Sequence, residues 1–576
     1  FLNLVFDIET DDLKATKVWC IVAQDLDTKK IYRYRPDEIE KGLKFLSKAD
    51  KLVGHNIIGF DLPVLKKLHN FTFDGKVVDT LVLSRLFNPV REGGHSLEAW
   101  GSSLGIEKIE FEDFTTYSED MLSYCVQDVK VNTRIYQNLI LTSKDFSKDS
   151  MRLEHDVAPI IKTQEINGFC FDEVHASMLL AKLRERIGNI ENEVKKVFKP
   201  RMLDVKLVTP SMKKDGTLSK RGLRPNEYDT IIKTQNYEPF YRKELKEFNL
   251  GSRKQIGEYL IDFGWKPKKF TPTGQPIVDE LTLFAIENIP QAKLIAEYLL
   301  IQKRIAQIDS WVEAMEEDGR VHGFVIPNGT ITGRMTHRNP NMAQVPSIHS
   351  PYGQECRACW TVEKGYKLLG VDASQLELRL LSHYMNDEDY IKNVTTGDIH
   401  ETNRKLAGLN TRDEAKTFIY AFIYGAGDKK IGSVVGGNSK DGERLRISFL
   451  NNIPALKKLR TSVSRAASKG WIKGLDGRKL FIRTQHAALN TLLQGAGAIF
   501  MKKALILLDK WANCNNLDYK FVANIHDEWQ IEVKEEQAEF LGEMAVKSMI
   551  EAGKLLNLRC AMTGEYKIGD NWSETH

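Results

Sequence analysis

The chain is poor in three features that would narrow its class at once: cysteine, long apolar runs and an excess of one charge. Its 576 residues include only seven cysteines, which are scattered along the sequence. A small, odd number of cysteines fits a reducing compartment rather than a disulfide-stabilised secreted protein. One C-x-x-C pair, Cys356 and Cys359, has no second pair at zinc-binding spacing, and we interpret it as coincidental.

No apolar run approaches the roughly 18 to 20 residues that span a bilayer, so no membrane segment is expected. The first six residues carry no charged leader, and no signal peptide is expected. The net charge is only +4, so any surface that binds nucleic acid must be local. A chain of 576 residues is too long for one hydrophobic core, which predicts about three or four domains.

The apolar pattern changes twice along the chain. Strands are predicted at residues 4–8, 19–23 and 52–53, and a helix at residues 122–139. We therefore expect an α/β domain over residues 1–145. From about residue 151 the pattern is helical, with long amphipathic stretches at 178–198 and 286–315, the second interrupted near Pro290. Mixed strands and helices return towards the C-terminus.

The two long amphipathic stretches are separated by residues 199–248, which we interpret as a loop-rich insertion. Eight lysines and arginines stand against two aspartates between residues 199 and 224, and proline and glycine interrupt the segment. Two interpretations stay open: a solvated flexible loop, or a surface that contacts the duplex backbone or docks a partner.

Four acids and a tyrosine in the first domain form a candidate metal site: Asp7, Glu9, Asp61, Asp128 and Tyr124. Asp7 and Glu9 are two residues apart on a predicted strand, so their side chains share one face. Tyr124 and Asp128 are four residues apart and share one face of a predicted helix. Four carboxylates suit two divalent ions, which activate water and stabilise the leaving oxygen in phosphodiester hydrolysis. The set therefore predicts a nuclease.

Two further acids belong to apolar strands of the C-terminal half. Asp372 follows the apolar run 368–371. Asp527 follows the run 521–525 and precedes 529–533, a pattern that predicts a hairpin with the acid at its turn. Two Mg²⁺ ions between these carboxylates would bridge a primer 3′-oxygen and an incoming triphosphate.

Between these two acids, Arg412, Lys416, Tyr420 and Tyr424 recur every four residues. On a helix they form one stripe. Arginine and lysine suit phosphate oxygens, and a tyrosine ring suits a base or sugar. The alternative is an amphipathic helix with a solvated basic end, but the mixture of charge and aromatics favours a nucleoside triphosphate site.

Taken together, these motifs resemble the A, B and C motifs of family A DNA polymerases, preceded by the three motifs of DEDDy-type 3′–5′ exonucleases. The resemblance continues through residues 332–334, 486–490 and 493–494. Strings that are similar to the replicative polymerases of T-seven-type short-tailed phages lie at residues 350–353, 398–400, 471–478 and 569–572. The resemblance covers essentially the whole chain.

The resemblance implies roles for individual residues. Asp372, Asp527 and the carbonyl of Ala373 would bind two Mg²⁺ ions, and Asp7, Glu9, Asp61 and Asp128 two more, with Tyr124 orienting water. Contacts to the triphosphate or primer-template are implied for His400, Arg412, Lys416, Tyr420, Arg334, Gln494 and His526. Lys416 would also protonate the pyrophosphate, and Glu377 with Tyr424 would exclude ribonucleotides. Glu528 is an acid near the site without a clear role.

The implied architecture is α/β and α+β, with an RNase H-like exonuclease domain followed by a right-hand polymerase of palm, fingers and thumb. We expect the exonuclease at 1–145, the thumb at 146–330 with its insertion at 199–248, and palm and fingers at 331–576, the fingers at about 400–480. The expected partners are primer-template DNA and dNTPs, with a thioredoxin-like processivity factor at the insertion and a replicative helicase as further candidates. A phage-encoded enzyme of this kind would act in the cytoplasm of the infected bacterium.

Three other functions compete with a replicative, proofreading polymerase: a repair polymerase of low processivity, a nuclease whose C-terminal half only binds DNA, and a single-subunit RNA polymerase. The intact acids and basic stripe argue against the second, and Glu377 with Tyr424 argues against the third. Tyr420 stands where many bacterial relatives have phenylalanine, which implies weak discrimination against dideoxynucleotides.

Overall fold

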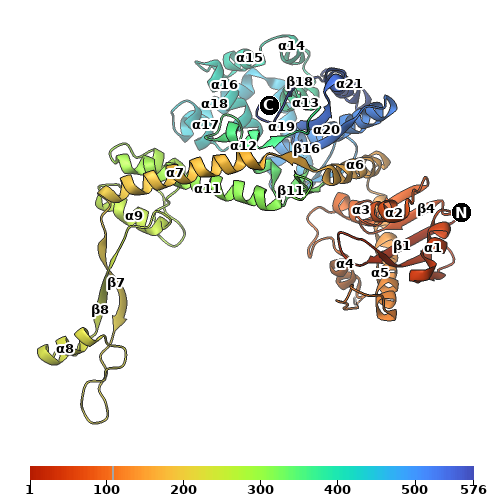
Figure 1. Cartoon of the computed structure of the whole chain (residues 1–576). Helices are drawn as coiled ribbons and strands as arrows, with labels where there is room; N and C mark the ends of the chain where they lie inside the picture. The colour runs from red at the N-terminus through yellow and green to blue at the C-terminus, as the bar shows by residue number, and fades with distance from the viewer. Residues whose placement is uncertain (107–108) are drawn as a thin grey trace. The chain divides into compact units, whose positions relative to one another are not determined.

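The computed structural model describes residues 1–106 and 109–576. The chain forms two compact units, one of residues 1–172 with 314–576 and one of residues 173–313. Figure 1 shows the helices and strands of both units, and each unit is described separately.

The N-terminal part of the first unit is built on a five-stranded sheet of order β3-β2-β1-β4-β5. Its strands are β1 (Asn3–Thr10), β2 (Val18–Asp25), β3 (Ile31–Tyr34), β4 (Lys51–Gly54) and β5 (Lys76–Asp79). The helices are α1 (Ile39–Leu46), α2 (Asp61–His69), α3 (Thr80–Phe87), α4 (Leu97–Leu104) and α5 (Glu119–Ser143). β1 pairs antiparallel with β2 and parallel with β4. The predicted strands and the predicted helix are confirmed, and the central strand is almost wholly buried because helices cover the sheet.

The C-terminal part is built on a four-stranded antiparallel sheet of order β16-β17-β13-β18. These strands are β13 (Tyr366–Ala373), β16 (Tyr519–Ile525), β17 (Glu528–Lys534) and β18 (Gly564–Gly569). Two long helices, α20 (Ala488–Cys514) and α21 (Ala538–Leu555), pack against each other beside this sheet. The predicted hairpin with Asp527 at its turn is therefore confirmed as β16 and β17.

Among the described residues, one helix has the length and composition of a membrane span, although the sequence predicts no membrane segment. The segment Gln485–Cys514 is long and apolar enough to qualify, with a mean hydropathy of 1.4. However, 78% of its apolar window is buried inside the protein, as in the core helix of a globular domain. Its apolarity is explained by packing against both α6 (Lys148–Asn167) and α21.

A helical region lies between β13 and α20. Its helices are α13 (Leu376–Met385), α14 (Glu388–Thr396), α15 (Ile399–Ala407), α16 (Arg412–Ile423), α17 (Asp428–Val434), α18 (Ser439–Asn452) and α19 (Pro454–Ala467). The hairpin of β14 (Trp471–Lys473) and β15 (Lys479–Phe481) follows them. Small strands complete the unit: β6 (Phe169–Phe171), β9 (Arg320–Val321), β10 (Phe324–Ile326), β11 (Thr336–Arg338) and β12 (Trp360–Thr361), with the short helix α12 (Gly353–Ala358).

The second unit contains the two predicted amphipathic helices, α7 (Glu173–Val197) and α11 (Pro290–Ala314). The predicted interruption near Pro290 marks the start of α11, because Pro290 is its first residue, where a missing N–H removes no hydrogen bond. The predicted start of the helix at residue 286 was therefore too early. The loop-rich interpretation of residues 199–248 was also wrong. That segment forms a β-ribbon of β7 (Arg201–Val208) and β8 (Phe240–Lys246) with α8 (Pro225–Thr234) between them (Figure 1). Two more helices follow, α9 (Arg253–Asp262) and α10 (Glu280–Phe284).

Candidate active sites

The two acids of the C-terminal half meet at one edge of the four-stranded sheet. β13 pairs with β17 so that Asp372 lies opposite Glu528. The backbone N–H of Ala373 donates to the carbonyl of Asp527 at 3.0 Å, which fixes the end of β13 against the hairpin turn. In that turn His526 has a φ of 55°, a left-handed conformation that non-glycine residues adopt at a cost. The sheet thus holds Asp372 and Asp527 side by side.

Crowding of these carboxylates disfavours their charged forms. Burial, followed by the charges of Asp527 and Glu528, raises the pKa of Asp372 to about 7. Burial also raises the pKa of Asp527, although the nearby Arg334 and His526 oppose this shift. An oxygen-only set of crowded carboxylates suits a hard divalent cation, which would relieve the repulsion.

Glu528 differs from its two neighbours because its carboxylate is fully engaged. It accepts hydrogen bonds from Gln530 Nε2 at 2.6 Å and from Trp572 Nε1 at 2.7 Å. His576 Nδ1 lies 2.7 Å from its other oxygen. Burial acts to raise the pKa of Glu528, but the contacts with His576 and Trp572 outweigh it and lower the pKa. Glu528 therefore anchors the turn rather than offering a free metal ligand.

The predicted basic and aromatic stripe is carried by α16. Thr411 and Glu414 form a capping box at its N-terminus, which fixes where the helix begins. Arg412, Lys416 and Tyr420 lie within the helix, whereas Tyr424 is the residue just after it. Arg412 Nε donates to Asp398 Oδ2 at 2.8 Å, and this pair is largely exposed, so an anion can replace the aspartate.

His400 faces this stripe from α15. Burial, followed by the charges of Arg412 and Lys416, lowers its pKa. Its Nδ1 is buried and has no hydrogen-bond partner among the described residues. A neutral imidazole beside two cations can donate to phosphate oxygens.

A second hydrogen-bonded group borders the same space. The hydroxyl of Tyr424 donates to Glu377 Oε1 at 2.6 Å, and Arg334 Nη2 lies 3.5 Å from that oxygen. Burial raises the pKa of Glu377, and the bond from Tyr424 opposes that rise. Burial, followed by the charge of Glu377, raises the pKa of Tyr420 to about 12, so its hydroxyl keeps its proton at neutral pH.

These side chains line one open cleft of about 600 Å³, a size suited to a nucleotide. Its lining consists of Arg334, Asp372, Ala373, Gln375, Leu376, Glu377, His400, Arg412, Lys416, Tyr420, Tyr424, His526 and Asp527. Of the residues predicted for this site, Gln494 does not line the cleft and lies half-buried on α20. Gln375 was missed by sequence reasoning. Gln375 lies in the turn after β13 with a φ of 48°. It could have been found, because it is only three residues from Asp372 in the same motif.

The four predicted acids of the N-terminal part also converge. β1 carries Asp7 and Glu9, and its Ile8 N–H donates to Asp61 Oδ1 at 3.2 Å, which joins the strand to the start of α2. Burial, followed by the charges of Asp61, Glu9 and Asp128, raises the pKa of Asp7 well above its usual range. Burial raises the pKa of Asp61 to about 7. Buried carboxylates that repel one another are suited to divalent ions.

Two residues near these acids were missed by sequence reasoning. The Cys125 thiol lies 3.8 Å from Asp7 Oδ2, and ligand atoms of Asp7, Glu9 and Cys125 all lie within 4.8 Å of one another. Asp79 is buried, and its carboxylate caps α3. Cys125 directly follows the predicted Tyr124, so its neighbourhood was readable, whereas nothing in the local sequence marks Asp79. The Tyr124 ring contacts those of Phe111 and Phe114 at centroid distances of 5.7 and 5.9 Å.

Comparisons with known proteins agree with this geometry. A family model described as DNA polymerase family A matches residues 226–574. The chain is similar to the DNA-directed DNA polymerase of Enterobacteria phage T3, with 34% identity over 704 residues and coverage of 100% of both chains. The corresponding enzyme of Escherichia phage T7 is 33% identical with the same coverage. Each of these two alignments spans 128 more positions than the 576 residues of this chain. The two phage enzymes therefore contain segments that this chain lacks.

Among solved structures, the chain is similar to the POL domain of Pol1 from M. smegmatis in complex with DNA primer-template and dNTP. The TM-score is 0.79 at 18% identity, with 100% of this chain and 96% of that chain covered. This likeness confirms the expected polymerase fold.

Proposed function

Because the chain belongs to DNA polymerase family A, we propose that the cleft around Asp372 and Asp527 is the site of its template-directed DNA synthesis. The chain is a DNA-directed DNA polymerase, and its substrates are a primed DNA template and dNTPs. The observation that carries the assignment of the site is one cleft that combines crowded carboxylates with a helix of basic and aromatic side chains.

Each wall of the cleft has a distinct task in this proposal. Arg412 exchanges Asp398 for a phosphate oxygen of the dNTP, while Lys416 lies one turn further along and supplies a proton to the departing pyrophosphate. Tyr420 packs on the sugar and base. The hydrogen-bonded pair Glu377 and Tyr424 borders the sugar and leaves no partner for a 2′-hydroxyl, which favours deoxynucleotides. Arg334, Gln494 and His526 contact the primer-template.

Two Mg²⁺ ions are proposed to be bound by Asp372, Asp527 and the Ala373 carbonyl. When bound, they lower the pKa of the primer 3′-hydroxyl and neutralise pyrophosphate. The protein's own contribution is to hold both carboxylates at a fixed separation through the Ala373–Asp527 backbone bond and the strained turn at His526. A site fixed in this way needs little reorganisation during reaction.

We propose that the N-terminal acids form a second, 3′–5′ exonuclease site that proofreads the product. Asp7, Glu9, Asp61 and Asp128 would bind two further Mg²⁺ ions, and Tyr124 would orient the attacking water. The raised pKa values of Asp7 and Asp61 support this, because carboxylates that resist ionisation without a counter-charge are suited to metal binding.

Two variants test both sites at once. Asp372→Ala should abolish primer extension with dNTPs and preserve degradation of single-stranded DNA. The double variant Asp7→Ala with Glu9→Ala should do the reverse. If both proteins lost both activities, the assignment of separate sites would be wrong.

The ribbon of the second unit is proposed to dock a processivity partner. Met202, Leu207, Tyr241 and Leu245 are each more than half exposed, and the strand register places them on one face. Exposed apolar side chains of this kind mark protein interaction surfaces. We propose a thioredoxin-like protein as the occupant, acting to lengthen each synthesis event.

Product length per binding event, measured with and without thioredoxin, tests this partner. Thioredoxin should lengthen the products of the parent but not those of a Leu207→Ser, Tyr241→Ser, Leu245→Ser triple variant. No effect on the parent would remove thioredoxin as the partner. A replicative helicase is a second proposed partner, tested by synthesis through a forked duplex. The similarity to phage enzymes supports genome replication in the cytoplasm of an infected bacterium.

A further inference from the structure

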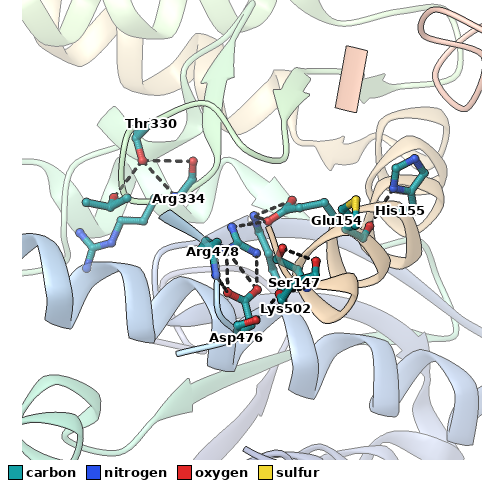
Figure 2. A network of polar contacts seen from close by, with 11 residues as sticks. Ser147, Glu154, His155, Thr330, Arg334, Asp476, Arg478 and Lys502 are labelled. Atoms are coloured by element: carbon teal, nitrogen blue, oxygen red, sulfur yellow. Dashed lines mark hydrogen bonds and ion pairs between the residues drawn. The ribbon is translucent and has the colours of Figure 1, made fainter. Parts of the chain in front are cut away.

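Helix α6 carries two consecutive residues that contact different parts of the first unit. Glu154 binds residues of the C-terminal part of the first unit, here called the polymerase part, and His155 binds a residue of its N-terminal part, here called the exonuclease part. Figure 2 shows Glu154 within a network that also includes Asp476, Arg478 and Lys502. None of these residues lines the polymerase cleft or belongs to the four proposed exonuclease ligands.

The Glu154 contacts anchor α6. Its carboxylate accepts from Arg478 Nη1 at 2.7 Å and from Lys502 Nζ at 2.8 Å. Arg478 also donates to Asp476 at 2.7 Å, and the Ser147 hydroxyl at the start of α6 donates to the Asp476 carbonyl. All four charged side chains are at most 5% exposed, and their charges balance. A buried, balanced and fully hydrogen-bonded cluster has one low-energy arrangement.

The same cluster reaches the turn that carries Arg334. A Cβ at Gly333 would lie only 3.0 Å from Arg478 Nη1, so this guanidinium closes off one side of the turn. The turn is fixed from within, because Arg334 N donates to Thr330 Oγ1 and Gly329 N donates to the Arg334 carbonyl, both at 3.0 Å. Arg478 therefore links α6 to the turn that carries Arg334 (Figure 2).

His155 faces the other way. Its Nε2 lies 3.0 Å from the backbone nitrogen of Asp79, and its Nδ1 lies 2.7 Å from the Met151 carbonyl. An amide N–H only donates and a carbonyl only accepts, so the two neighbours select the neutral imidazole with its proton on Nδ1.

Asp79 connects this contact to the exonuclease ligands. Its carboxylate accepts from the backbone N–H groups of Asn56 at 2.9 Å and Ile58 at 3.1 Å, which lie in the loop that leads to Asp61. The next residue, Thr80, donates to Asn132 Oδ1 at 2.7 Å, on the helix that carries Asp128. A shift of Asp79 therefore moves both ligand-bearing segments.

We propose that His155 is a positioning residue of the exonuclease site, fixed in place by the Glu154 cluster of the polymerase part. The inference rests on the proposed exonuclease function of residues 1–145 and adds to it a dependence on a residue outside that segment. The loss of a hydrogen bond that holds a metal ligand in position typically lowers metal affinity or activity by about 10- to 100-fold.

The test compares three full-length variants. His155→Leu should lower the rate of single-stranded DNA degradation at least about tenfold and raise the Mg²⁺ concentration for half-maximal degradation, with primer extension within about twofold of the parent. His155→Gln keeps an acceptor near the Nε2 position and should recover most of the rate. His322→Leu is the matched control, because His322 Nδ1 also contacts α6, at the Glu165 carbonyl, but far along the helix from Asp79.

Amide hydrogen exchange of metal-free protein gives a readout that is independent of activity. The peptide containing Asn56 and Ile58 should lose protection in His155→Leu and keep it in His155→Gln and His322→Leu. Suppose that the parent degrades DNA and that His155→Leu changes neither the degradation rate nor the hydrogen exchange. The positioning role of His155 would then be wrong, while the exonuclease proposal would stand. A His155→Gln variant as impaired as His155→Leu would also contradict the positioning role. If the parent degrades no DNA, or if its degradation of DNA does not require Asp7 and Glu9, the proposed exonuclease function would be wrong instead.

Glu154 supplies a second arm. Because Glu154→Gln alone leaves buried cations unpaired, the charge-balanced double variant Glu154→Gln with Lys502→Met is used. It should reduce both degradation and primer extension, since α6 and the Arg478 contact at Gly333 loosen together. Unchanged extension and degradation in the folded double variant would contradict the anchoring role.

Discussion

At the residue scale, the charged forms of the acids of the polymerase site destabilise the folded protein until a cation binds. The pKa of Asp372 is about 7 in the folded protein, against 3.8 for a free side chain. The folded state therefore binds a proton more tightly than the unfolded state, and its stability falls as pH rises from about 4 to 7. Above pH 7 the whole penalty is present.

We therefore expect Asp372→Asn to stabilise the metal-free protein at pH 8 by about 1–3 kcal/mol, after discounting for partial exposure, and to have little effect near pH 4. Calorimetry in EDTA across this pH range measures the effect. Mg²⁺ should raise the Tm of the parent more than that of the variant. Glu528→Gln is the control of opposite sign, because Glu528 has a lowered pKa and three partners, and its loss should destabilise. An Asp372→Asn effect that is equal at both pH values would contradict the explanation.

Tyr420 allows a second prediction at this scale. Its hydroxyl keeps its proton and can donate a hydrogen bond where a dideoxynucleotide lacks its 3′-hydroxyl. Tyr420→Phe should therefore lower the use of dideoxynucleotides relative to dNTPs by at least about tenfold, the effect of removing one buried hydrogen bond. Competitive single-nucleotide incorporation measures this ratio. A Phe variant that accepts dideoxynucleotides as readily as the parent would refute the role.

The sequence predicted the site residues that belong to local motifs. It missed the residues whose role depends on contacts with distant parts of the chain. Asp372, Asp527 and the α16 stripe stand in strings of apolar or periodic residues, and the structure brings them into one cleft. Glu154 and His155 look like ordinary polar residues of an amphipathic helix. Their partners lie 324 and 76 residues away in the chain, a distance that no local pattern reveals.

At the scale of elements, the start of α16 is fixed by its capping box. Thr411 Oγ1 accepts from Glu414 N at 3.1 Å, and Glu414 accepts in return from Thr411 N at 3.0 Å. Thr411→Ala should weaken this helix end by about 1 kcal/mol and raise the KM for dNTP, because Arg412 loses its fixed position. Thr411→Ser keeps the acceptor and should behave as the parent. Steady-state kinetics with hydrogen exchange of α16 provides the measurement, and identical exchange in both variants would exclude the cap as the cause.

Helices and strands were predicted correctly where apolar residues follow one clear pattern along the sequence. The prediction failed where charged residues interrupt that pattern. The strands around Asp7 and Asp527 are nearly continuous apolar runs, typical of buried strands. β7 alternates apolar and charged residues and buries little, so its composition favoured a loop although its backbone pairs with β8. Its exposed apolar residues match a strand whose covering partner is another protein, in line with the proposed docking of a processivity factor.

At the scale of the whole molecule, a net charge of only +4 means that DNA must be held by local groups of cations. Binding should still weaken steeply with salt, because phosphate contacts release condensed counterions. The slope of log affinity against log salt concentration counts those contacts, at about −0.9 per phosphate. This slope distinguishes contact of the basic insertion with the DNA duplex from docking of a protein partner on it.

Lys213, Lys214, Lys220 and Arg221 are exposed in the insertion. If the ribbon docks a protein, replacing all four by alanine should leave the slope unchanged and the affinity for primer-template DNA within about twofold of the parent in the absence of a partner. If the ribbon contacts the duplex, the slope should become shallower by about one for each phosphate that is no longer neutralised, up to about four. Fluorescence anisotropy between about 50 and 300 mM salt measures the slope, with Arg334→Ala as the control. We propose that Arg334 contacts base edges in the minor groove rather than phosphates, so its loss should weaken binding at every salt concentration without changing the slope. A shallower slope for the quadruple variant would replace the docking proposal with a direct DNA clamp.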